Sequence, residues 1–255
     1  MEKSPTRSPL DLRRFESRKQ SHLEISLDPR VQAAESAGFD RIRLEHDALP
    51  ELDFAEIELA TPFLRGAARR ELATPFFVSG MTAGHASARI VNERLAKACA
   101  KRGWIFGVGS QRRELETDRP AIDAWSDLSA SAPGLTSLGN LGLSQAIRST
   151  PEEIRRLAEN VGASAFCIHL NALQEVLQPE GTPQFAGGLA ALRTLARKLK
   201  KPLILKETGC GFSRKTLAKI KSIPLAAIDV SGLGGTHWGR IEGVRAGGEG
   251  DSIRA

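Results

Sequence analysis

Short apolar segments recur from about residue 75 to residue 232, and segments with helical spacing of apolar residues lie between them. The apolar segments predict six β-strands, at residues 75–80, 104–110, 135–140, 165–170, 202–207 and 226–232. Nearly continuous apolar strands are typical of a parallel sheet whose faces are both covered. Successive strands begin about 30 residues apart, which leaves room for a helix in each connection.

Residues typical of helix ends support four of these helices. Segment 87–103 ends at Gly103, a residue suited to the left-handed conformation that closes many helices. Segment 150–163 begins with Thr150 as a predicted N-cap, followed by Pro151 at the first helical position. The other two predicted helices occupy residues 188–202 and 213–224.

This alternation predicts an α/β fold, either a (β/α)8 TIM barrel or a doubly wound sheet. Every predicted strand ends in small or polar residues. Functional residues at the carboxyl ends of all strands are typical of the barrel. In a doubly wound sheet, functional residues gather at the one point where the strand order reverses. The GxGxxG motif typical of such sheets does not follow the first predicted strand. Only six βα units are visible, and 23 residues follow Gly232 without another apolar strand. We therefore expect residues 74–255 to form an incomplete barrel in a chain that stops before the barrel closes.

The part of the chain before the first barrel strand divides in two. Residues 1–16 are rich in Ser, Pro and Arg and predict a disordered tail. Residues 17–73 predict an extension that packs on the barrel, with a helix starting at Ser17 as N-cap, a short strand at 56–59 and a hairpin over 63–75.

Composition narrows the kind of protein. The net charge is +6, but the basic residues are scattered and form no long block of the nucleic-acid-binding kind. A mild positive balance suits an anionic small substrate. Three cysteines without a CxxC motif indicate a reduced, cytoplasmic protein. The N-terminus lacks the apolar region of a secretory signal, and no apolar run is long enough to span a membrane.

The segment HLNALQEVLQPEG, residues 169–181, places an unusual number of polar side chains directly after a buried strand. They are His169, Asn171, Gln174, Glu175, Gln178 and Glu180. Taken alone, the segment is equally compatible with a ligand site and with a helix whose first turn is polar. Lys206 likewise ends the fifth strand, where a buried cation is costly unless it has a partner such as Glu207 or a ligand.

The sequence resembles the flavin-dependent, type 2 isopentenyl diphosphate isomerases from about residue 17 to residue 238. Eight motifs carry the resemblance: RKQSH at 18–22, GFDRIRLEHDALPELD at 38–53, MTAGH at 81–85, GVGSQR at 107–112, NLG at 140–142, HLNALQEVLQPEG at 169–181, KETGCG at 206–211 and SGLGGTHW at 231–238. Two alternatives are a truncated, non-catalytic family member and another FMN-dependent barrel oxidoreductase. The first and sixth motifs argue against the second alternative.

The resemblance implies a (β/α)8 barrel of the FMN-binding type. The implied reaction interconverts isopentenyl diphosphate and dimethylallyl diphosphate in isoprenoid biosynthesis by flavin-assisted proton addition and removal. It would use reduced FMN, Mg2+ and NADPH as reductant. The implied partners are a small diphosphate substrate, neither nucleic acid nor membrane, and further copies of the chain in a homo-oligomer, as in complete relatives.

The resemblance also implies roles for residues. Gln174 is the implied catalytic residue, because an amide can position the alkene without competing as an acid, and the residues after Ser17 contribute to the substrate site. The implied substrate contacts are Arg18, Lys19, His22, Ser110, Gln111, Arg112, His169, Asn171 and Gln174. The implied FMN contacts are Met81, Thr82, Ala83, Ser110, Asn140, Lys206, Ser231 and Thr236. Ala83 stands where the family usually has glycine, and Glu175 is the implied Mg2+ ligand.

Overall fold

A computed structural model describes residues 12–64, 69–82, 88–116, 125 and 128–247. Its centre is a six-stranded parallel sheet whose strands follow one another in chain order. The strands are β3 (Phe77–Val78), β4 (Ile105–Gly107), β5 (Thr136–Gly142), β6 (Ala165–Leu170), β7 (Leu203–Glu207) and β8 (Ala227–Asp229). A doubly wound sheet reverses its strand order at the switch point, so this order confirms the barrel-type α/β prediction. Within the described residues, β3 and β8 each pair on one side only.

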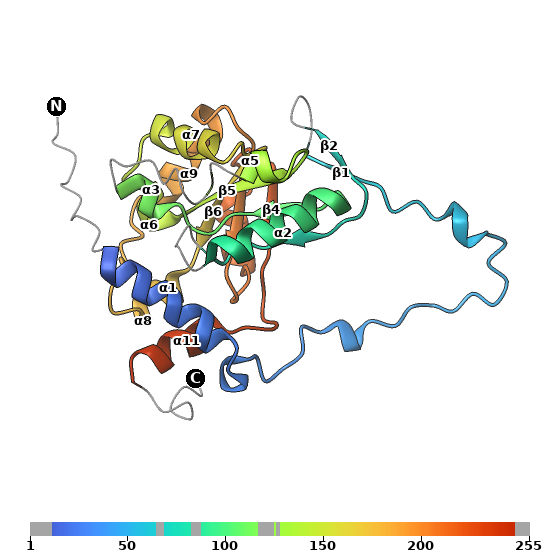
Figure 1. The fold of residues 1–255 in the computed structure, drawn as a ribbon, viewed down its shortest axis with the longest axis horizontal. Coiled ribbons are helices and arrows are strands. Elements are labelled where there is room, and N and C mark those ends of the chain that lie inside the picture. Colours follow the sequence, from blue (N-terminus) through green and yellow to red (C-terminus); the bar gives the residue numbers. More distant parts are fainter. Residues whose placement is uncertain (1–11, 65–68, 83–87, 117–124, 126–127, 248–255) are drawn as a thin grey trace.

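Helices connect the strands and cover one face of the sheet (Figure 1). They are α2 (Arg89–Arg102), α3 (Arg112–Glu116), α5 (Leu128–Ser131), α6 (Leu143–Ala146), α7 (Pro151–Asn160), α8 (Ala172–Leu177), α9 (Gly188–Lys198) and α10 (Arg214–Ile220). The last helix, α11 (Trp238–Arg245), follows β8 and packs against α8. The four predicted helices are confirmed as α2, α7, α9 and α10. Gly103 closes α2 in the left-handed conformation, and Thr150 forms a capping box with Glu153 at the start of α7. None of the helices within the described part of the chain is long and apolar enough to cross a membrane.

Side chains alternate between the two faces of the sheet, as the period of two in a strand requires. Phe106, Phe166, Ile168 and Leu205 pack against the helices in the larger apolar cluster. Their neighbours Ile105, Leu138, Cys167 and Ile204 form a second cluster on the opposite face, which we call the inner face. The same alternation directs the polar residues at the strand ends toward one face or the other.

The N-terminal part differs from the prediction in two places. The first helix, α1 (Leu12–Ser26), begins five residues before the predicted N-cap Ser17, so residues 12–16 of the predicted tail are helical. Leu, Arg and Glu between 12 and 16 are good helix formers and extend the helix backward. Residues 1–11 of that tail lie outside the described part of the chain. α1 contacts α11, which brings the two ends of the described chain together.

Residues 33–60 form a long excursion away from the sheet (Figure 1). It contains only the short 3-10 helices η2 (Phe39–Arg41) and η3 (Phe54–Glu56), after η1 (Pro29–Val31). The predicted strand at 56–59 is wrong, because no neighbouring strand is available there to pair with. The strand instead begins at residue 61, two residues after the predicted one ends, as β1 (Thr61–Phe63), which pairs antiparallel with β2 (Arg70–Leu72) in the predicted hairpin.

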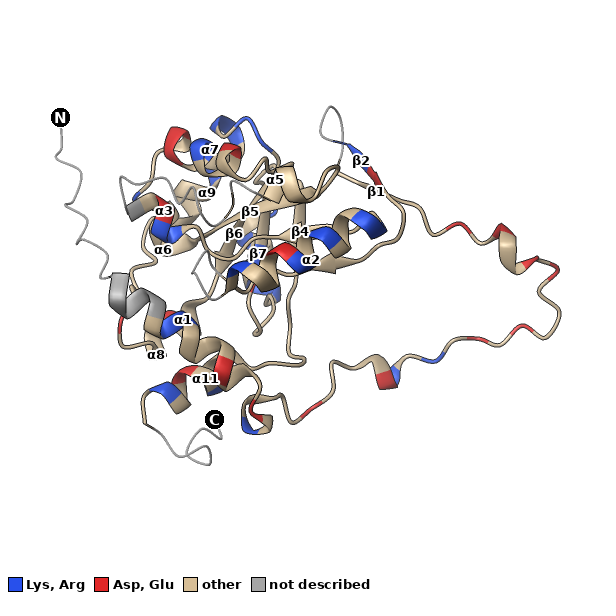
Figure 2. Ribbon diagram, in the orientation of Figure 1, with Lys and Arg blue, Asp and Glu red and all other residues tan. Residues whose placement is uncertain are grey.

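Charged residues are distributed over the whole described chain (Figure 2). Lys and Arg alternate with Asp and Glu on α2 and α7, and residues 33–60 carry eight acidic and two basic residues. α1 carries three of the predicted substrate contacts, Arg18, Lys19 and His22. The packing of α1 on α11 determines where these three residues lie relative to the sheet.

Candidate functional site

The inner face of the sheet becomes polar toward the carboxyl ends of its strands. Asn140, His169 and Lys206 lie two positions beyond the apolar Leu138, Cys167 and Ile204, so all three point to the inner face. His169 pairs in register with Lys206, and Lys206 with Asp229. Four adjacent strands thus contribute one polar layer above an apolar one.

Hydrogen bonds fix the orientation of His169 in this layer. Asn140 donates from Nδ2 to the carbonyl oxygen of Val108 over 3.0 Å, so its Oδ1 faces His169 Nδ1 at 2.8 Å as an acceptor. Burial, with the nearby charges of Lys206 and Lys19, lowers the pKa of His169 to about 3. The ring is therefore neutral at pH 7, donates from Nδ1 to Asn140 and presents Nε2 as an acceptor.

Lys206 is buried and has three oxygen neighbours. Its Nζ donates to the carbonyl oxygen of Glu207 over 2.9 Å and to Ser231 Oγ over 3.4 Å, and lies 3.6 Å from Asp229 Oδ2. The structure thus brings the predicted contacts Lys206 and Ser231 together. The counter-charge comes from Asp229, and not from the carboxylate of Glu207 that the sequence offered as an alternative partner.

A second group of polar side chains forms where α1, α8 and α11 meet. Its centre is Glu242 on α11, which is fully buried at 0% exposure. Glu242 Oε1 lies 2.9 Å from His22 Nε2 and accepts a bond of 3.1 Å from Gln174 Nε2. Arg245 donates to Glu242 Oε2 and, over 2.7 Å, to Glu180 Oε1. Two motifs predicted to be functional, at 18–22 and 169–181, therefore meet on one carboxylate.

Gln178 and Glu180 connect this group to Arg18. With its amide oriented to satisfy both neighbours, Gln178 accepts from Arg18 over 2.9 Å and donates to Glu242 Oε1 over 3.1 Å. Arg18 Nε also lies 4.0 Å from Glu180 Oε1. The polar residues of 169–181 are therefore used by the protein to hold α1 and α11.

The protonation states in this group follow from burial and hydrogen bonding. Burial lowers the pKa of His22 to about 4, although its hydrogen bond to Glu242 opposes the shift. Burial alone would raise the pKa of Glu242, but hydrogen bonds from His22, Gln174 and Arg245 outweigh it and lower that pKa to about 2. A neutral His22 thus donates from Nε2 to an ionised Glu242. No described residue hydrogen-bonds His22 Nδ1, which remains an acceptor.

Several cations converge on the same region. Burial, followed by repulsion from Arg18, lowers the pKa of Lys19 to about 7. Arg112 and Arg245 act on both Arg18 and Lys19, and Lys19 acts on His169 of the inner-face layer. Cations that repel one another inside a protein destabilise it unless an anion binds between them. Glu180 and Glu242 offset part of this repulsion, and a further anion that bound beside Arg18 and Lys19 would offset more of it.

Glu175, the predicted Mg2+ ligand, is buried on α8 and already hydrogen-bonded. Asn171 Nδ2 donates to its Oε1 over 3.0 Å, and the backbone N–H of Thr182 donates to its Oε2 over 2.7 Å. Asn171 Oδ1 is buried and has no partner among the described residues. One carboxylate and one unpartnered amide oxygen are hard ligands of the kind Mg2+ prefers.

The side chains of Ser110, Gln111 and Arg112 differ in exposure. Ser110 and Arg112 are partly exposed, whereas Gln111 is 1% exposed. Gln111 Nε2 donates to the carbonyl oxygen of Leu157 over 2.8 Å, and its Oε1 accepts from the backbone N–H of Asn140 over 3.1 Å. Gln111 therefore holds β5 against α7, and its predicted substrate contact stays a prediction.

The predicted FMN residues after the first strand are only partly described. Thr82 donates from its hydroxyl to Asn92 Oδ1 on α2, so this side chain is engaged within the protein. Met81 is partly exposed, and Ala83 lies outside the described residues.

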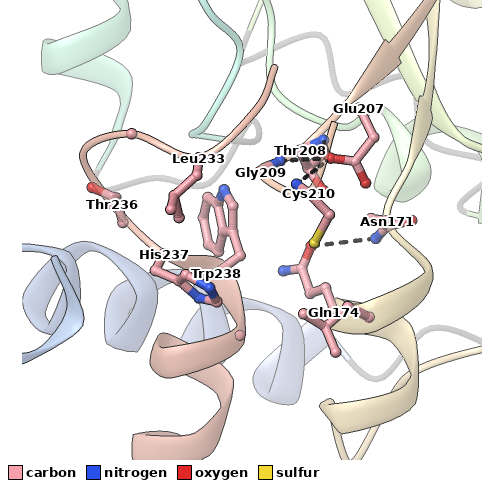
Figure 3. A pocket seen from close by; sticks show the side chains of 13 residues that line it. Asn171, Gln174, Glu207, Thr208, Gly209, Cys210, Leu233, Thr236, His237 and Trp238 are labelled. Carbon is pink, nitrogen blue, oxygen red and sulfur yellow. Dashed lines mark hydrogen bonds between the residues drawn. The ribbon is translucent and has the colours of Figure 1, made fainter. Parts of the chain in front are cut away.

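Thr236 lines a cavity between the loop after β7, α8 and the start of α11 (Figure 3). Asn171 and Gln174 lie on the opposite wall of this cavity, with Trp238 and His237 beside Thr236. The Trp238 ring stands edge-on to His22 with centroids 5.2 Å apart. The cavity therefore lies next to the group around Glu242.

The sequence did not predict α11 or the role of Glu242 and Arg245. A usable signal is the apolar pair Trp238 and Ile241 at helical spacing, with an i, i+3 acid–base pair at Glu242 and Arg245. Gly239 and Gly243 within the same eight residues weaken that signal, because glycine is a poor helix former.

Comparison with curated proteins finds close relatives. The chain is 48% identical over 232 residues to an isopentenyl-diphosphate delta-isomerase of Bdellovibrio bacteriovorus, covering 91% of this chain and 67% of the relative. Proteins of the same name from Legionella pneumophila strain Corby and Pseudescherichia vulneris are 47% and 43% identical, with 91% of this chain and 66% of each relative covered. The chain thus spans about two thirds of the length of the relatives it matches. No protein-family model matches it.

Solved structures give only a distant likeness. A mandelate oxidase mutant with an FMN adduct is 12% identical with a TM-score of 0.49, covering 83% of this chain and 66% of that one. A lactate oxidase of Pediococcus acidilactici is 14% identical with a TM-score of 0.31, covering 98% of this chain and 88% of that one. Neither reaches a TM-score of 0.5, and the fold assignment rests on the strand order described above.

Proposed function

This chain belongs to the isopentenyl-diphosphate delta-isomerase family, and we propose that it is of the flavin-dependent type 2 and interconverts isopentenyl and dimethylallyl diphosphate. The observation that carries the proposal is the convergence of Arg18, Lys19 and Arg112 beside the uncharged side chains of Gln174 and His169. Cations bind the diphosphate, and neutral groups face the hydrocarbon end.

The diphosphate would bind between α1 and the inner face. Arg18 offers a planar guanidinium suited to two phosphate oxygens, and Lys19 adds a point charge. Burial and, after it, repulsion from Arg18 lower the pKa of Lys19, and a bound diphosphate would oppose both by attracting the charged form, so that Lys19 takes up a proton when substrate binds. His169 is neutral and contacts the substrate without adding charge.

The alkene requires a dry site in which one carbon gains a proton and another loses one. Gln174 is held on both sides, since its Nε2 donates to Glu242 and its Oε1 accepts from Asn171 Nδ2 over 3.3 Å. A fixed, non-ionising amide positions the alkene. Glu242 stays ionised, and Nδ1 of the neutral His22 can accept a hydrogen bond from a group in the site.

The inner-face layer fits FMN. Lys206 is a buried cation next to Ser231, and a cation near a flavin ring stabilises its anionic reduced form. When bound and reduced, with NADPH as reductant, the flavin supplies the electron-rich ring that the isomerisation needs without net redox change. Asn140, Lys206 and Ser231 would hold it, with Ser110 and Thr236 at the edges.

Mg2+ would bind through Glu175 and Asn171 together with the substrate phosphates. Asn171 Oδ1 is the unpartnered buried oxygen that a cation would satisfy. The metal would neutralise part of the diphosphate charge. The free thiols of Cys99, Cys167 and Cys210 suit a reducing cytoplasm, where we place the chain.

The test is to purify the chain, titrate FMN by flavin fluorescence and assay isomerisation with reduced flavin and Mg2+. We expect flavin binding and conversion that both fall in Arg18→Ala plus Lys206→Ala, while Glu159→Ala on the outer surface of α7 changes neither. Flavin binding without isomerisation would contradict the proposed reaction, and no flavin binding would contradict the cofactor.

A further inference from the structure

Glu207, the last residue of β7, folds its carboxylate into the loop that follows it. Its Oε2 accepts hydrogen bonds from four successive backbone N–H groups, those of Thr208, Gly209, Cys210 and Gly211, over 2.5–2.9 Å (Figure 3). The carboxylate is buried at the rim of the cavity that Gln174 and Thr236 also line.

Successive N–H groups that point at one spot form a concavity that binds anions. The loop needs glycine to make this shape, because Gly211 has φ +71° and Gly209 has φ +143°, where other residues are strained. In such a concavity an external anion is the usual occupant, whereas here the protein supplies its own. Without the carboxylate, four N–H donors would point at the same spot with no acceptor, and the hydrogen bonds that stabilise this loop conformation would be lost.

The loop connects the cavity to the inner-face layer. The carbonyl oxygen of Glu207 accepts from Lys206 Nζ, and Thr208 Oγ1 donates to the carbonyl oxygen of Leu170 over 3.3 Å. Asn171 follows Leu170 directly, and Asn171 and Gln174 on α8 line the same cavity as the loop (Figure 3). A change in the conformation of the loop therefore alters both the position of Lys206 and the shape of the cavity that Gln174 lines.

We propose that Glu207 is a positioning residue that acts as a built-in anion: its carboxylate holds the 208–211 loop in the shape that forms the cavity wall and orients Lys206. The effect on activity rests on the proposed function, whereas the effect on the loop does not. A consequence is that the carboxylate can be replaced by a small free carboxylate of the same chemistry.

The experiment uses the full chain with Glu207→Ala and adds formate, which fits the space that the carboxylate leaves. We expect the amide resonances of Gly209 and Gly211 to move toward positions typical of unstructured chain, and limited proteolysis to cut the loop. Formate should restore both saturably. In the activity assay we expect kcat/KM to fall by about tenfold or more, mainly through kcat, with partial recovery in formate.

Glu159→Ala is the matched control, because among the described residues Glu159 forms an ion pair with Arg155 on the surface of α7 and no other. The loop should be unchanged in this variant, both with and without formate. If Glu207→Ala does not fold, Glu207→Gln keeps the volume and one acceptor oxygen but removes the charge, and it should show loop changes of the same kind but smaller. Unchanged Gly209 and Gly211 resonances in the variant, or restoration by chloride as readily as by formate, would overturn the proposal. Loop changes with no isomerase activity in the parent chain would contradict the proposed function only.

Discussion

His22 and Glu242 are 220 positions apart in the sequence, yet Nε2 of the histidine lies 2.9 Å from Oε1 of the carboxylate. This contact joins the first described helix to the last one and closes the side of the site next to Gln174. Because α1 carries Arg18 and Lys19, the same contact places the predicted diphosphate ligands.

Glu242→Ala should reduce stability strongly. Arg245 would lose one of its carboxylate partners, and His22 and Gln174 would lose the acceptor that they share. The removal of one partner from a buried charged group costs about 3–5 kcal/mol. Urea unfolding should show a loss in this range. Glu159→Ala breaks an exposed helical pair and should cost less than about 0.5 kcal/mol. Equal losses in the two variants would contradict the central role of Glu242.

Stability should fall between about pH 6.5 and pH 4. The folded protein keeps His22 and His169 neutral, with pKa values of about 4 and about 3, while the unfolded chain protonates them near their ordinary pKa. In this window the unfolded state binds more protons at these two histidines, which makes stability rise with pH by up to roughly 2–3 kcal/mol per pH unit. Glu114 offsets part of this rise, because burial raises its pKa to about 7 and the folded protein holds its proton in the same window. Urea unfolding across the window measures the slope. His169→Gln should remove about half of the contribution of the two histidines.

Lys19 should take up a proton when an anion binds. Its pKa of about 7 leaves it largely neutral at pH 8 in the free protein, and a neighbouring diphosphate favours the charged form. Calorimetric titration with inorganic diphosphate, in two buffers of different ionisation enthalpy, gives the number of protons taken up. Lys19→Arg stays charged throughout, so the difference between the two proteins isolates Lys19 from the titration of diphosphate itself. Identical proton uptake would contradict the assignment.

Glu175→Gln should weaken Mg2+ dependence and turnover together. The substitution keeps an oxygen that can accept from Asn171 or Thr182, so the fold is retained, but it removes the charge that a metal ligand needs. A magnesium titration of the rate should shift by about tenfold or more. Kinetics that do not change across the titration would show that Glu175 serves only to hold Thr182.

The sheet and its inner-face residues could be predicted from the sequence, because uninterrupted apolar runs define strands and a period of two then fixes which side chains share a face. Asn140, His169 and Lys206 follow from that rule. Thr150 and Gly103 were also predictable, since capping depends on neighbours within one turn.

Two features of the site could not be predicted, because each depends on distant packing. α11 has only eight residues, with two glycines, and it is stabilised by contact with α1 and α8. The side chain of Gln111 points into the protein, whereas those of Ser110 and Arg112 are partly exposed. A hydrogen bond to the carbonyl oxygen of Leu157, 46 positions away, holds Gln111 in this direction. Nothing local in a loop sequence specifies such a direction.

The chain should associate with itself through β8. Ile228 and Val230 are 40% and 62% exposed, β8 pairs on one side only within the described residues, and Ile228 lines an apolar groove with Leu217 of α10. An open strand edge beside an apolar groove offers both backbone hydrogen bonds and buried area to a second copy. The excursion at 33–60 also exposes apolar residues such as Leu44, but its eight acidic residues repel the same segment of another copy. Light scattering should therefore show concentration-dependent association that Ile228→Lys abolishes and Leu44→Ser leaves in place; the opposite pattern would assign the association to the excursion.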